Sequence, residues 1–204
     1  MKGRSKGKVW MGMGIAVLML GVAVFFFLNP KESGAPGASG EPGLYVHENP
    51  GFAVRYPEGF ILDTDYTYTA MGEGKEIKGV SFTVPKSLTE GTNLSSDTRL
   101  SIEWKNKTTC TVQDFLDGAE HVQTVVDEDA VYVIGIGGGA GAGNRYEEAV
   151  YVPGGVGCTA VRYFIHSTTV ENYPEGTVKA FDRTALMSAF DGMRRSFSHE
   201  GTLE

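Results

Sequence analysis

The sequence contains little of what most metal and thiol centres require. Only two of its 204 residues are cysteines, Cys110 and Cys158, and only four are histidines. Three of the histidines, His47, His121 and His199, are scattered and share no metal-ligand spacing. No nucleophile elbow, H-E-x-x-H or C-x-x-C motif is present. These absences exclude the common zinc, redox and hydrolase signatures, and the sequence predicts neither a metal nor a cofactor.

Charge is absent from one long segment. Residues 9–28, VWMGMGIAVLMLGVAVFFFL, hold no charged side chain. A helix rises ~1.5 Å per residue, so this run spans the ~30 Å hydrocarbon core of a bilayer. The preceding tail, residues 1–8, carries four Lys or Arg and no acidic residue, and basic flanks stay on the cytoplasmic side. We therefore expect one transmembrane signal-anchor, with the N-terminus cytoplasmic and the C-terminal domain exported.

A cleaved signal peptide is the alternative to an anchor. Its apolar region usually has about 7 to 15 residues, fewer than here. Ala35 and Ala38 lie in a stretch of small residues that cleavage could use, and the product would then be secreted to the periplasm. No cysteine follows the apolar run closely, so a lipoprotein is not expected.

The composition divides the rest of the chain. Residues 29–43, NPKESGAPGASGEPG, have almost nothing to bury and predict a flexible linker. Residues 44–200 have the length of one ordinary domain, followed by a tail at 201–204.

The part of the chain beyond the apolar run is acidic, with 14 Lys and Arg against 25 Asp and Glu, a net charge of about −11. That charge argues against nucleic acid or anionic lipid as a partner and leaves an exported or membrane protein.

Cys110 and Cys158 both lie in the exported part. In an oxidising compartment the simplest expectation is one disulfide between them. It would close a loop of about 49 residues, worth ~4 kcal/mol in the chain-entropy model. Two free thiols or half of a metal site are the alternatives, although no further metal ligands stand at short spacing.

Hydrophobic alternation with a period of two dominates the domain. In Arg99–Lys105, RLSIEWK, apolar and polar residues alternate strictly, which predicts a strand with one buried and one exposed face. Weaker strand signals lie at Phe52–Tyr56, Ile77–Val84, Ala130–Ile136, Tyr146–Val152 and Thr159–His166. A hairpin loop at 153–157 joins the last two, and a symmetric loop would place Glu148 opposite Arg162.

Two helices are expected. Thr111 can cap a short helix over Val112–Gly118. Asp182–Ser196 is the stronger prediction, because Leu186, Phe190, Met193 and Phe197 form one apolar stripe that should dock on the sheet as core. Arg194 and Arg195 suit the negative end of that helix dipole. The fold class is therefore α+β, a mostly antiparallel β-sheet flanked by helices, preceded by one N-terminal transmembrane helix.

The run Glu48–Phe60, ENPGFAVRYPEGF, resembles the opening of PsbP-like domains, with an aromatic strand followed by Tyr-Pro-x-Gly and an aromatic residue. Met193–Phe197, MRRSF, resembles their closing segment, whereas Phe60 stands where Trp is common. This superfamily includes a Ran-binding nuclear import factor and many exported bacterial proteins. The resemblance implies an antiparallel sheet with helices on both faces. It carries over no catalytic residue, since these domains mostly act as binding or accessory modules.

A second resemblance covers the stretch from Gly141 to Arg183. Its segments GAGNRYEE, CTAVRYFIH and NYPEGTVKAFDR are similar to a recurring block in uncharacterised proteobacterial exported proteins. The resemblance implies a bacterial source and names no activity. A bacterial source in turn implies that the single-pass anchor lies in the inner membrane and that the C-terminal domain is periplasmic.

The glycine run Gly135–Gly143 formally contains G-x-G-x-x-A. A dinucleotide site needs a helix directly after such a run, and the following Asn144–Val152 reads as a strand. We expect a mobile loop between strands, with the lip of a ligand or partner site as the other option.

One group of polar residues is a candidate ligand or partner site. His166 ends an apolar strand near Asn144, and Arg145, Glu147, Glu148, Arg162, Tyr163 and Tyr173 lie nearby in sequence or across the hairpin. A histidine beside a carboxylate is a possible general base. The simpler expectation is a hydrogen-bonded histidine at the end of a strand and one weak surface ion pair.

The sequence thus favours a membrane-anchored accessory or protein-interaction module over an enzyme. The alternatives are a small-ligand or sensor domain that uses Gly135–Gly143 as a lid, and an enzyme that uses His166, Glu148 and Arg162.

Overall fold

The computed structural model describes residues 41–155 and 157–199. In chain order its elements are β1 (Gly43–Glu48), β2 (Gly51–Tyr56), β3 (Ile61–Asp63), β4 (Thr67–Tyr68), β5 (Ile77–Thr83), α1 (Lys86–Thr89), β6 (Arg99–Trp104), η1 (Val112–Asp114), β7 (Glu120–Asp127), β8 (Ala130–Gly141), β9 (Asn144–Pro153), β10 (Thr159–Thr168), η2 (Val170–Asn172), α2 (Arg183–Ser196) and β11 (Ser198–His199). The fold is α+β and mostly antiparallel, as the sequence predicts.

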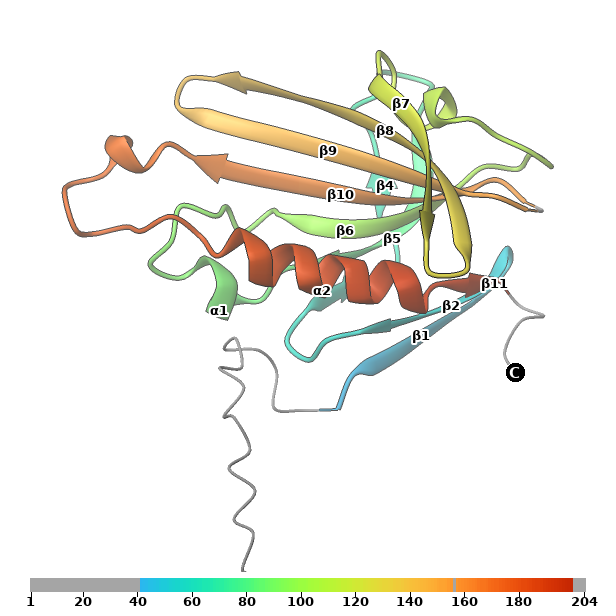
Figure 1. The fold of residues 1–204 in the computed structure, drawn as a ribbon, viewed down its shortest axis with the longest axis horizontal. Helices are drawn as coiled ribbons and strands as arrows, with labels where there is room; N and C mark the ends of the chain where they lie inside the picture. Colours follow the sequence, from blue (N-terminus) through green and yellow to red (C-terminus); the bar gives the residue numbers. More distant parts are fainter. Residues whose placement is uncertain (1–40, 156, 200–204) are drawn as a thin grey trace, which may run out of the picture. The chain divides into compact units, whose positions relative to one another are not determined.

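Two sheets build the domain. The larger sheet has the order β3-β5-β6-β10-β9-β8-β7, with β4 paired to β5, and the smaller one has the order β1-β2-β11. Every strand pair is antiparallel. Figure 1 shows α2, in red, lying between the larger sheet and the small one. All six strands expected from the alternation are present, and the structure adds β1, β3, β4, β7 and β11.

α2 forms where the sequence predicts a helix. The Asp182 carboxylate caps it by accepting a hydrogen bond from the Ala185 amide at 2.9 Å. Leu186, Phe190 and Met193 are buried in the main core, together with aliphatic and aromatic residues of β2, β5, β6 and β10. Phe197 follows the helix instead of belonging to it, and its ring centroid lies 5.6 Å from that of Phe52. The expectation that this stripe is core is confirmed.

A second core covers the opposite face of the larger sheet. The segment around η1 packs on this face, and its side chains Val112, Phe115 and Leu116 are buried in the second core. The helix expected over Val112–Gly118 is only one 3₁₀ turn, Val112–Asp114. The Thr111 amide donates to the Asp114 carboxylate at 2.9 Å, which stabilises the start of that turn.

Because both faces of the sheet are covered, one prediction about β6 is wrong. Ser101 and Glu103 were expected on an exposed face, and both are fully buried. The strand is correct, but its polar face lies under the segment that contains η1.

The glycine run is also different from the prediction. Gly135 to Gly141 belong to β8 and pair along their whole length with β9, so they are strand and not a loop. Only Ala142 and Gly143 form the turn before β9. Close packing explains the glycine at position 135, because a Cβ there would stand 2.2 Å from Cγ1 of Val112. The β7–β8 ladder ends at Ile136, so Gly137 to Gly141 are held by the β9 ladder alone. That ladder makes the run part of the sheet instead of a mobile lid.

Arg194 does more than complement the helix dipole. Its side chain is buried, with Nε donating to the Tyr163 hydroxyl at 2.9 Å and Nη2 bonding the Asp127 carboxylate. Its guanidinium carbon lies 4.8 Å and 4.7 Å from the ring centroids of Tyr132 and Tyr151. Arg194 therefore joins the C-terminal end of α2 to the hairpin of β7 and β8.

This junction predicts a sensitivity to acid. Hydrogen bonds from Arg194 and then Arg195 lower the pKa of Asp127. A carboxyl with a lowered folded-state pKa contributes stability that is present above its unfolded pKa of about 3.9 and is lost as the pH falls through the folded value. In thermal melts between pH 7 and pH 3, Asp127→Asn should lower the melting temperature at neutral pH and converge on wild type at the acid end. The exposed Asp129→Asn is the matched control, and parallel pH profiles for wild type and Asp127→Asn would contradict the expectation.

The membrane prediction falls on residues that the structure does not describe. The expected span at 9–28 and most of the linker at 29–43 lie outside the described ranges, which begin at Glu41. Within those ranges no helix has the length and apolar character to cross a bilayer. The linker was predicted to end at Gly43, but β1 already begins at that residue.

Candidate functional site

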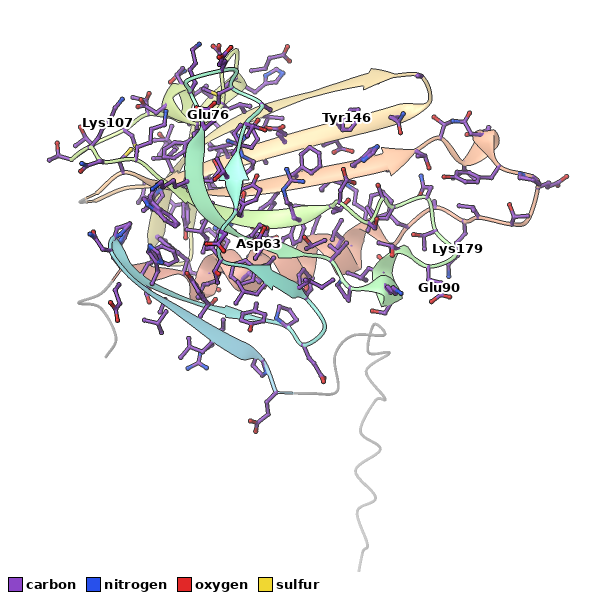
Figure 2. The ribbon with its side chains drawn as sticks, turned by 180° about the vertical axis from the view of Figure 1, so that it is seen from behind. Asp63, Glu76, Glu90, Lys107, Tyr146 and Lys179 are labelled. Carbon is purple, nitrogen blue, oxygen red and sulfur yellow. The ribbon has the colours of Figure 1, made fainter. Side chains whose placement is uncertain are left out.

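His166 lies at the edge of the domain, near the end of β10. Its Nδ1 is 2.8 Å from Oδ1 of Asp97, and its Nε2 is 3.0 Å from Oδ1 of Asn144. The Tyr146 ring stacks on the imidazole with centroids 4.4 Å apart, on the side of the sheet shown in Figure 2. Burial would raise the pKa of Asp97, but hydrogen bonds from Ser95 and His166 lower it. The predicted proximity of His166 and Asn144 is confirmed, and the carboxylate partner is one that sequence reasoning missed.

Arg162 belongs to a different environment. Its side chain is fully buried, and its Nε and Nη2 donate to the two oxygens of Glu103 at 2.8 Å each. Nη1 donates to Glu148, and Nη2 also donates to the Phe115 carbonyl. The guanidinium carbon lies 3.6 Å from the Tyr68 ring centroid. Burial alone would lower the pKa of Arg162, but the charge and hydrogen bonds of Glu103 raise it, so the guanidinium stays charged.

The ion pair of Glu148 and Arg162 therefore exists, but its nature differs from the expectation. A surface pair was expected, and the Arg162 side chain has no exposed area, whereas 13% of that of Glu148 is exposed. The backbone register also differs, because Glu148 pairs with Phe164 and Arg162 pairs with Val150. The connection between β9 and β10 is not symmetric about residue 155, so the two side chains meet diagonally across the ladder.

The remaining predicted residues lie apart from both groups. Arg145 pairs with Glu147 at 3.2 Å, and Glu147 also pairs with Arg183 at 2.6 Å. The Tyr173 hydroxyl is 2.9 Å from Oγ1 of Thr168. The predicted site residues thus form several separate contacts and do not converge.

A small hollow of about 320 Å³ borders the glycine strand. Tyr68, Leu116, Gly137, Tyr146 and Glu148 are among its lining residues, whereas His166 and Arg162 are not. Three acidic residues line the hollow, Asp117, Glu120 and Glu148. The two carboxylate oxygens of Glu148 lie 3.3 Å and 3.1 Å from the Tyr68 hydroxyl, which donates to them. A general base at His166 would not face this space.

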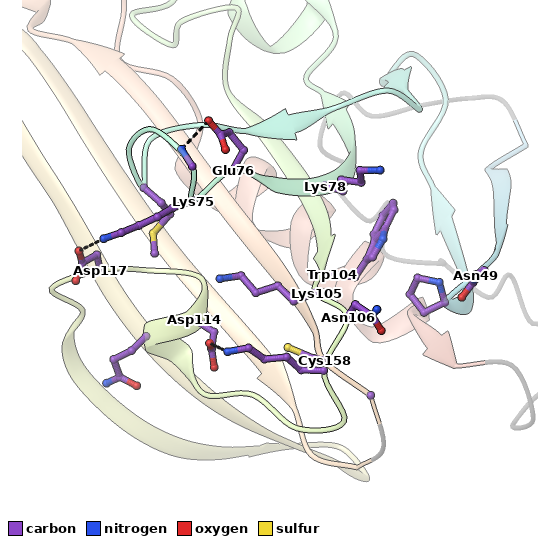
Figure 3. A pocket seen from close by; sticks show the side chains of 16 residues that line it. Asn49, Lys75, Glu76, Lys78, Trp104, Lys105, Asn106, Asp114, Asp117 and Cys158 are labelled. Atoms are coloured by element: carbon purple, nitrogen blue, oxygen red, sulfur yellow. Dashed lines mark hydrogen bonds and ion pairs between the residues drawn. The ribbon is translucent and has the colours of Figure 1, made fainter.

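A larger hollow of about 920 Å³ lies where β5 begins and β6 ends (Figure 3). Its lining residues come from the β1–β2 turn, the segment before β5, and the segments that follow β6 and precede β10: Asn49, Pro50, Met71, Gly74, Lys75, Glu76, Lys78, Trp104, Lys105, Asn106, Lys107, Gln113, Asp114, Asp117, Gly157 and Cys158. The sequence signal that points here is a pair of lysines at each of two strand ends, Lys75 with Lys78 and Lys105 with Lys107.

Cys158 borders the larger hollow, and Cys110 is its neighbour. Burial raises the pKa of the Cys110 thiol, and the hydrogen bond to Cys158 raises it further. Both residues are free thiols in this structure, and the disulfide stays a prediction. The raised pKa of the Cys110 thiol makes a nucleophilic role for Cys110 unfavourable, because the thiolate is the reactive species.

The cysteine pair gives a direct prediction. If the protein is isolated from an oxidising compartment, Cys158→Ser should lower its stability by ~2–4 kcal/mol, the range typical of a native disulfide. Cys110→Ser should cost the same, and the double variant should cost no more than either single one, because the bond is lost only once. Differential scanning calorimetry measures all three. Two alkylatable thiols in denatured, non-reduced protein would contradict the disulfide.

β7 is the last strand of the larger sheet and has a partner, β8, on one side only. The pairing is regular from Gln123 to Asp127 and shifts between Glu120 and Gln123. Val126 and Val131 face each other across this pair, and Val133 lies two residues further on the same face. They expose 67%, 47% and 37% of their surface. The hairpin therefore presents an unpaired backbone edge beside an apolar surface.

Comparison with known proteins shows no family model and no curated protein that the chain matches. In the described residues, no three His, Cys, Asp or Glu side chains are grouped so as to hold a metal ion.

Proposed function

We propose that this protein is a membrane-tethered, exported, PsbP-like interaction module, and that the open edge of β7 is its partner-binding surface. The observation that carries the proposal is the combination of a free strand edge with three exposed valines. Two of the residues predicted as a ligand or partner site, Glu148 and Arg162, bond to one another, and Arg162 also bonds Glu103, so that buried cluster offers no free group to a partner.

A free strand edge recruits an extended segment of another chain through backbone hydrogen bonds. Natural proteins usually block such an edge with lysine, proline or a bulge. The range 120–141 contains no Lys, Arg or Pro, and its bulge affects only the start of β7. The regular half, from Gln123 to Asp127, remains available for about five residues of partner strand.

Charge indicates what the partner strand contains. The hairpin carries Glu120, Asp127, Glu128 and Asp129 with no Lys or Arg between them. A second copy would bring the same carboxylates, and a chain whose part beyond the apolar run has a net charge of about −11, against this edge, which is repulsive. The expected occupant is therefore an extended segment of another exported or membrane protein, with apolar side chains facing the valines and basic residues beside them.

Site-specific photo-crosslinking in intact cells tests this proposal. A photoreactive residue at Thr124, on the exposed edge, should give one discrete heterologous product, and the added substitution Val126→Lys should abolish it by placing a charge on the surface. A photoreactive residue at Ser188, on the exposed side of α2, is the matched control and should give none. A product that contains only this chain, or the same products from both positions, would contradict the proposal.

A small-ligand or sensor function is the second candidate, supported by the 320 Å³ hollow beside Gly137 and Glu148. The ligand would contact the Glu148 carboxylate and the Tyr146 ring without any movement of β8. An enzyme built on His166, Glu148 and Arg162 has less support, since Glu148 and Arg162 bond to one another whereas His166 bonds Asp97 and Asn144.

The expected membrane anchor predicts how the full-length protein behaves in cell fractionation. Full-length protein should sediment with membranes and resist extraction by high salt or carbonate, because residues 9–28 are long and apolar enough to span the bilayer. Mature protein that begins near residue 36 or 39 and stays in the soluble fraction would show that the segment is a cleaved signal peptide.

A further inference from the structure

β8 continues past the end of its outer neighbour, β7. The β7–β8 ladder ends where Glu120 pairs with Ile136, whereas β8 runs on to Gly141 and pairs there with β9 alone. Figure 1 shows β8 and β9 extending as a long hairpin beyond β7. Within the described residues no other strand pairs with Gly137–Gly141. In an antiparallel ladder every second residue turns its N–H and C=O away from the partner strand, so this stretch presents a second free edge.

Two glycines of this stretch have no explanation within the described part of the chain. Gly138 is required by its backbone, because its φ is +152° and a Cβ would stand 2.3 Å from the Tyr146 carbonyl oxygen. At Gly139 and Gly141 a Cβ would meet no described atom within 4 Å, and neither residue has a positive φ. Glycine weakens a strand, and inside one it often marks the close approach of a ligand or another backbone. The space above Gly139 and Gly141 therefore suits a visiting group.

Two hollows meet at these glycines. One, of about 360 Å³, follows β8 from Ile136 to Ala140. It shares four lining residues with the hollow of about 320 Å³: Glu120, Gly137, Gly138 and Tyr146. Tyr146 pairs with Gly139 across the β8–β9 ladder, and its ring stacks on His166 of the next strand, β10. The ring forms a wall beside the glycines, and we call the joined hollows the glycine trough.

The charge of the trough indicates the charge of its occupant. The described residues that line the 320 Å³ hollow include no Lys, Arg or His, but three carboxylates: Asp117, Glu120 and Glu148. Glu148 is already bonded to Arg162, whereas Glu120 forms no ion pair with any residue in the described ranges. The face of a tyrosine ring also attracts a cation. A positively charged group therefore suits the space between Glu120 and Tyr146.

We infer that the edge of β8 at Gly137–Gly141 binds an extended peptide segment of another protein, whose Lys or Arg side chain lies across the glycine trough. Backbone hydrogen bonds to β8 hold the segment, and the trough selects the side chain. A peptide suits the edge better than a small cation, because only a backbone pairs with a row of free N–H and C=O groups. A second copy of this chain would bring the same acidic hairpin and be repelled.

This site is separate from the outer edge of β7 that carries the proposed function. No residue of Gln123–Asp127, the regular half of β7, lines either hollow. A partner on β8 occupies the position that β7 leaves empty, whereas a partner on β7 adds a strand outside it. The two sites can therefore be blocked one at a time.

The test selects a random heptapeptide library, displayed on phage, against full-length protein in phosphatidylcholine nanodiscs, with empty nanodiscs for counter-selection. The selected peptides should share one Lys or Arg and lack proline, which cannot donate to a strand ladder. A synthetic, fluorescently labelled selected peptide should bind saturably by fluorescence anisotropy. Methylation of its backbone nitrogens one at a time should weaken binding at alternate positions only, because every second N–H faces β8.

Gly139→Val should weaken binding of this peptide at least tenfold, a difference that anisotropy resolves easily, because the new side chain fills the trough. Its melting temperature should be unchanged or higher, since valine favours a strand and meets no described atom there. Glu120→Gln should weaken binding about two- to fivefold by removing one exposed charge. The matched controls are Gly192→Ala, at a glycine in open space on α2, and Asp129→Asn, at an exposed carboxylate outside the trough. Both should bind as the parent protein does.

Full binding by Gly139→Val, weakening by N-methylation without alternation, or selection of no peptide with a basic residue would each overturn the inference. Val126→Lys, which blocks the surface beside β7, should leave peptide binding unchanged. If Val126→Lys abolishes binding and Gly139→Val does not, the peptide lies on β7, so this inference fails and the proposed function stands. If Gly139→Val abolishes binding and Thr124 gives no crosslink in cells, the β8 site stands and the β7 proposal fails.

Discussion

Phe190→Ala should lower the free energy of unfolding by ~3–5 kcal/mol, the usual range for truncating a buried phenylalanine. Phe190 has no exposed surface. Its ring centroid lies 5.1 Å from that of Tyr163 on β10 and 6.3 Å from that of Phe60. Removal of the ring leaves a void where α2 meets the larger sheet. A domain of this size is typically stable by only ~5–15 kcal/mol, so the variant should melt early or express poorly.

The measurement is urea denaturation of the full-length protein in detergent, followed by circular dichroism. Ser188→Ala changes the exposed side of the same helix, and Lys179→Ala changes an exposed residue before it. Both should shift stability by less than about 0.5 kcal/mol. An unchanged midpoint for Phe190→Ala would show that this face of α2 is not core, and α2 would then compete with β7 as the partner surface.

Glu103→Gln should destabilise the domain by a similar amount, ~3–5 kcal/mol, because it leaves the buried Arg162 guanidinium without its main counter-charge. Glu103 receives two hydrogen bonds from Arg162 and one from the Ser101 hydroxyl, each at 2.8 Å. Glutamine keeps the shape of the side chain but removes the charge and places an amide donor among donors. Glu148→Gln should cost less, since the Glu148 carboxylate is partly exposed.

A compensating variant separates the charge effect from packing. Replacing Glu103 by leucine and Arg162 by methionine together removes both buried charges, and such replacements are often neutral or stabilising. The double variant should therefore recover most of the stability lost in Glu103→Gln. Urea denaturation gives the free energy of unfolding of Glu103→Gln and of the double variant, which are then compared. If the double variant is less stable than Glu103→Gln, the pair contributes through shape and hydrogen bonding, and the charge argument is wrong.

Local sequence patterns were sufficient for six of the strands and for α2, but not for the environments of these elements. The alternation in Arg99–Lys105 identifies β6 correctly, since period two is a property of the strand alone. Whether the polar face of that strand meets water depends on what lies above it, and the segment with η1 covers it. The same limit applied to the glycine run, where β9 and Val112 explain Gly135 better than any loop function.

The candidate site was only partly predictable for the same reason. His166 and Asn144 flank one hairpin, so strand pairing brings them together. Asp97 lies 69 residues from His166 in the chain, and no local pattern connects them. Glu148 and Arg162 were linked through the hairpin, whereas the stronger partner of Arg162, Glu103, is 59 residues away.

By itself the sequence determined the acidic balance of the chain, the α+β class, the six main strands and the C-terminal helix with its buried stripe. These features depend on residues within one or two turns or on a single strand, where periodicity and capping act. Only the tertiary structure decided that Glu103 and Arg162 are buried together, that β7 is left as an open edge, and that β8 continues beyond β7 with open space above Gly139. Each of these depends on which distant segments pack on which face of the sheet, because burial and charge proximity are properties of the folded arrangement and not of the local chain.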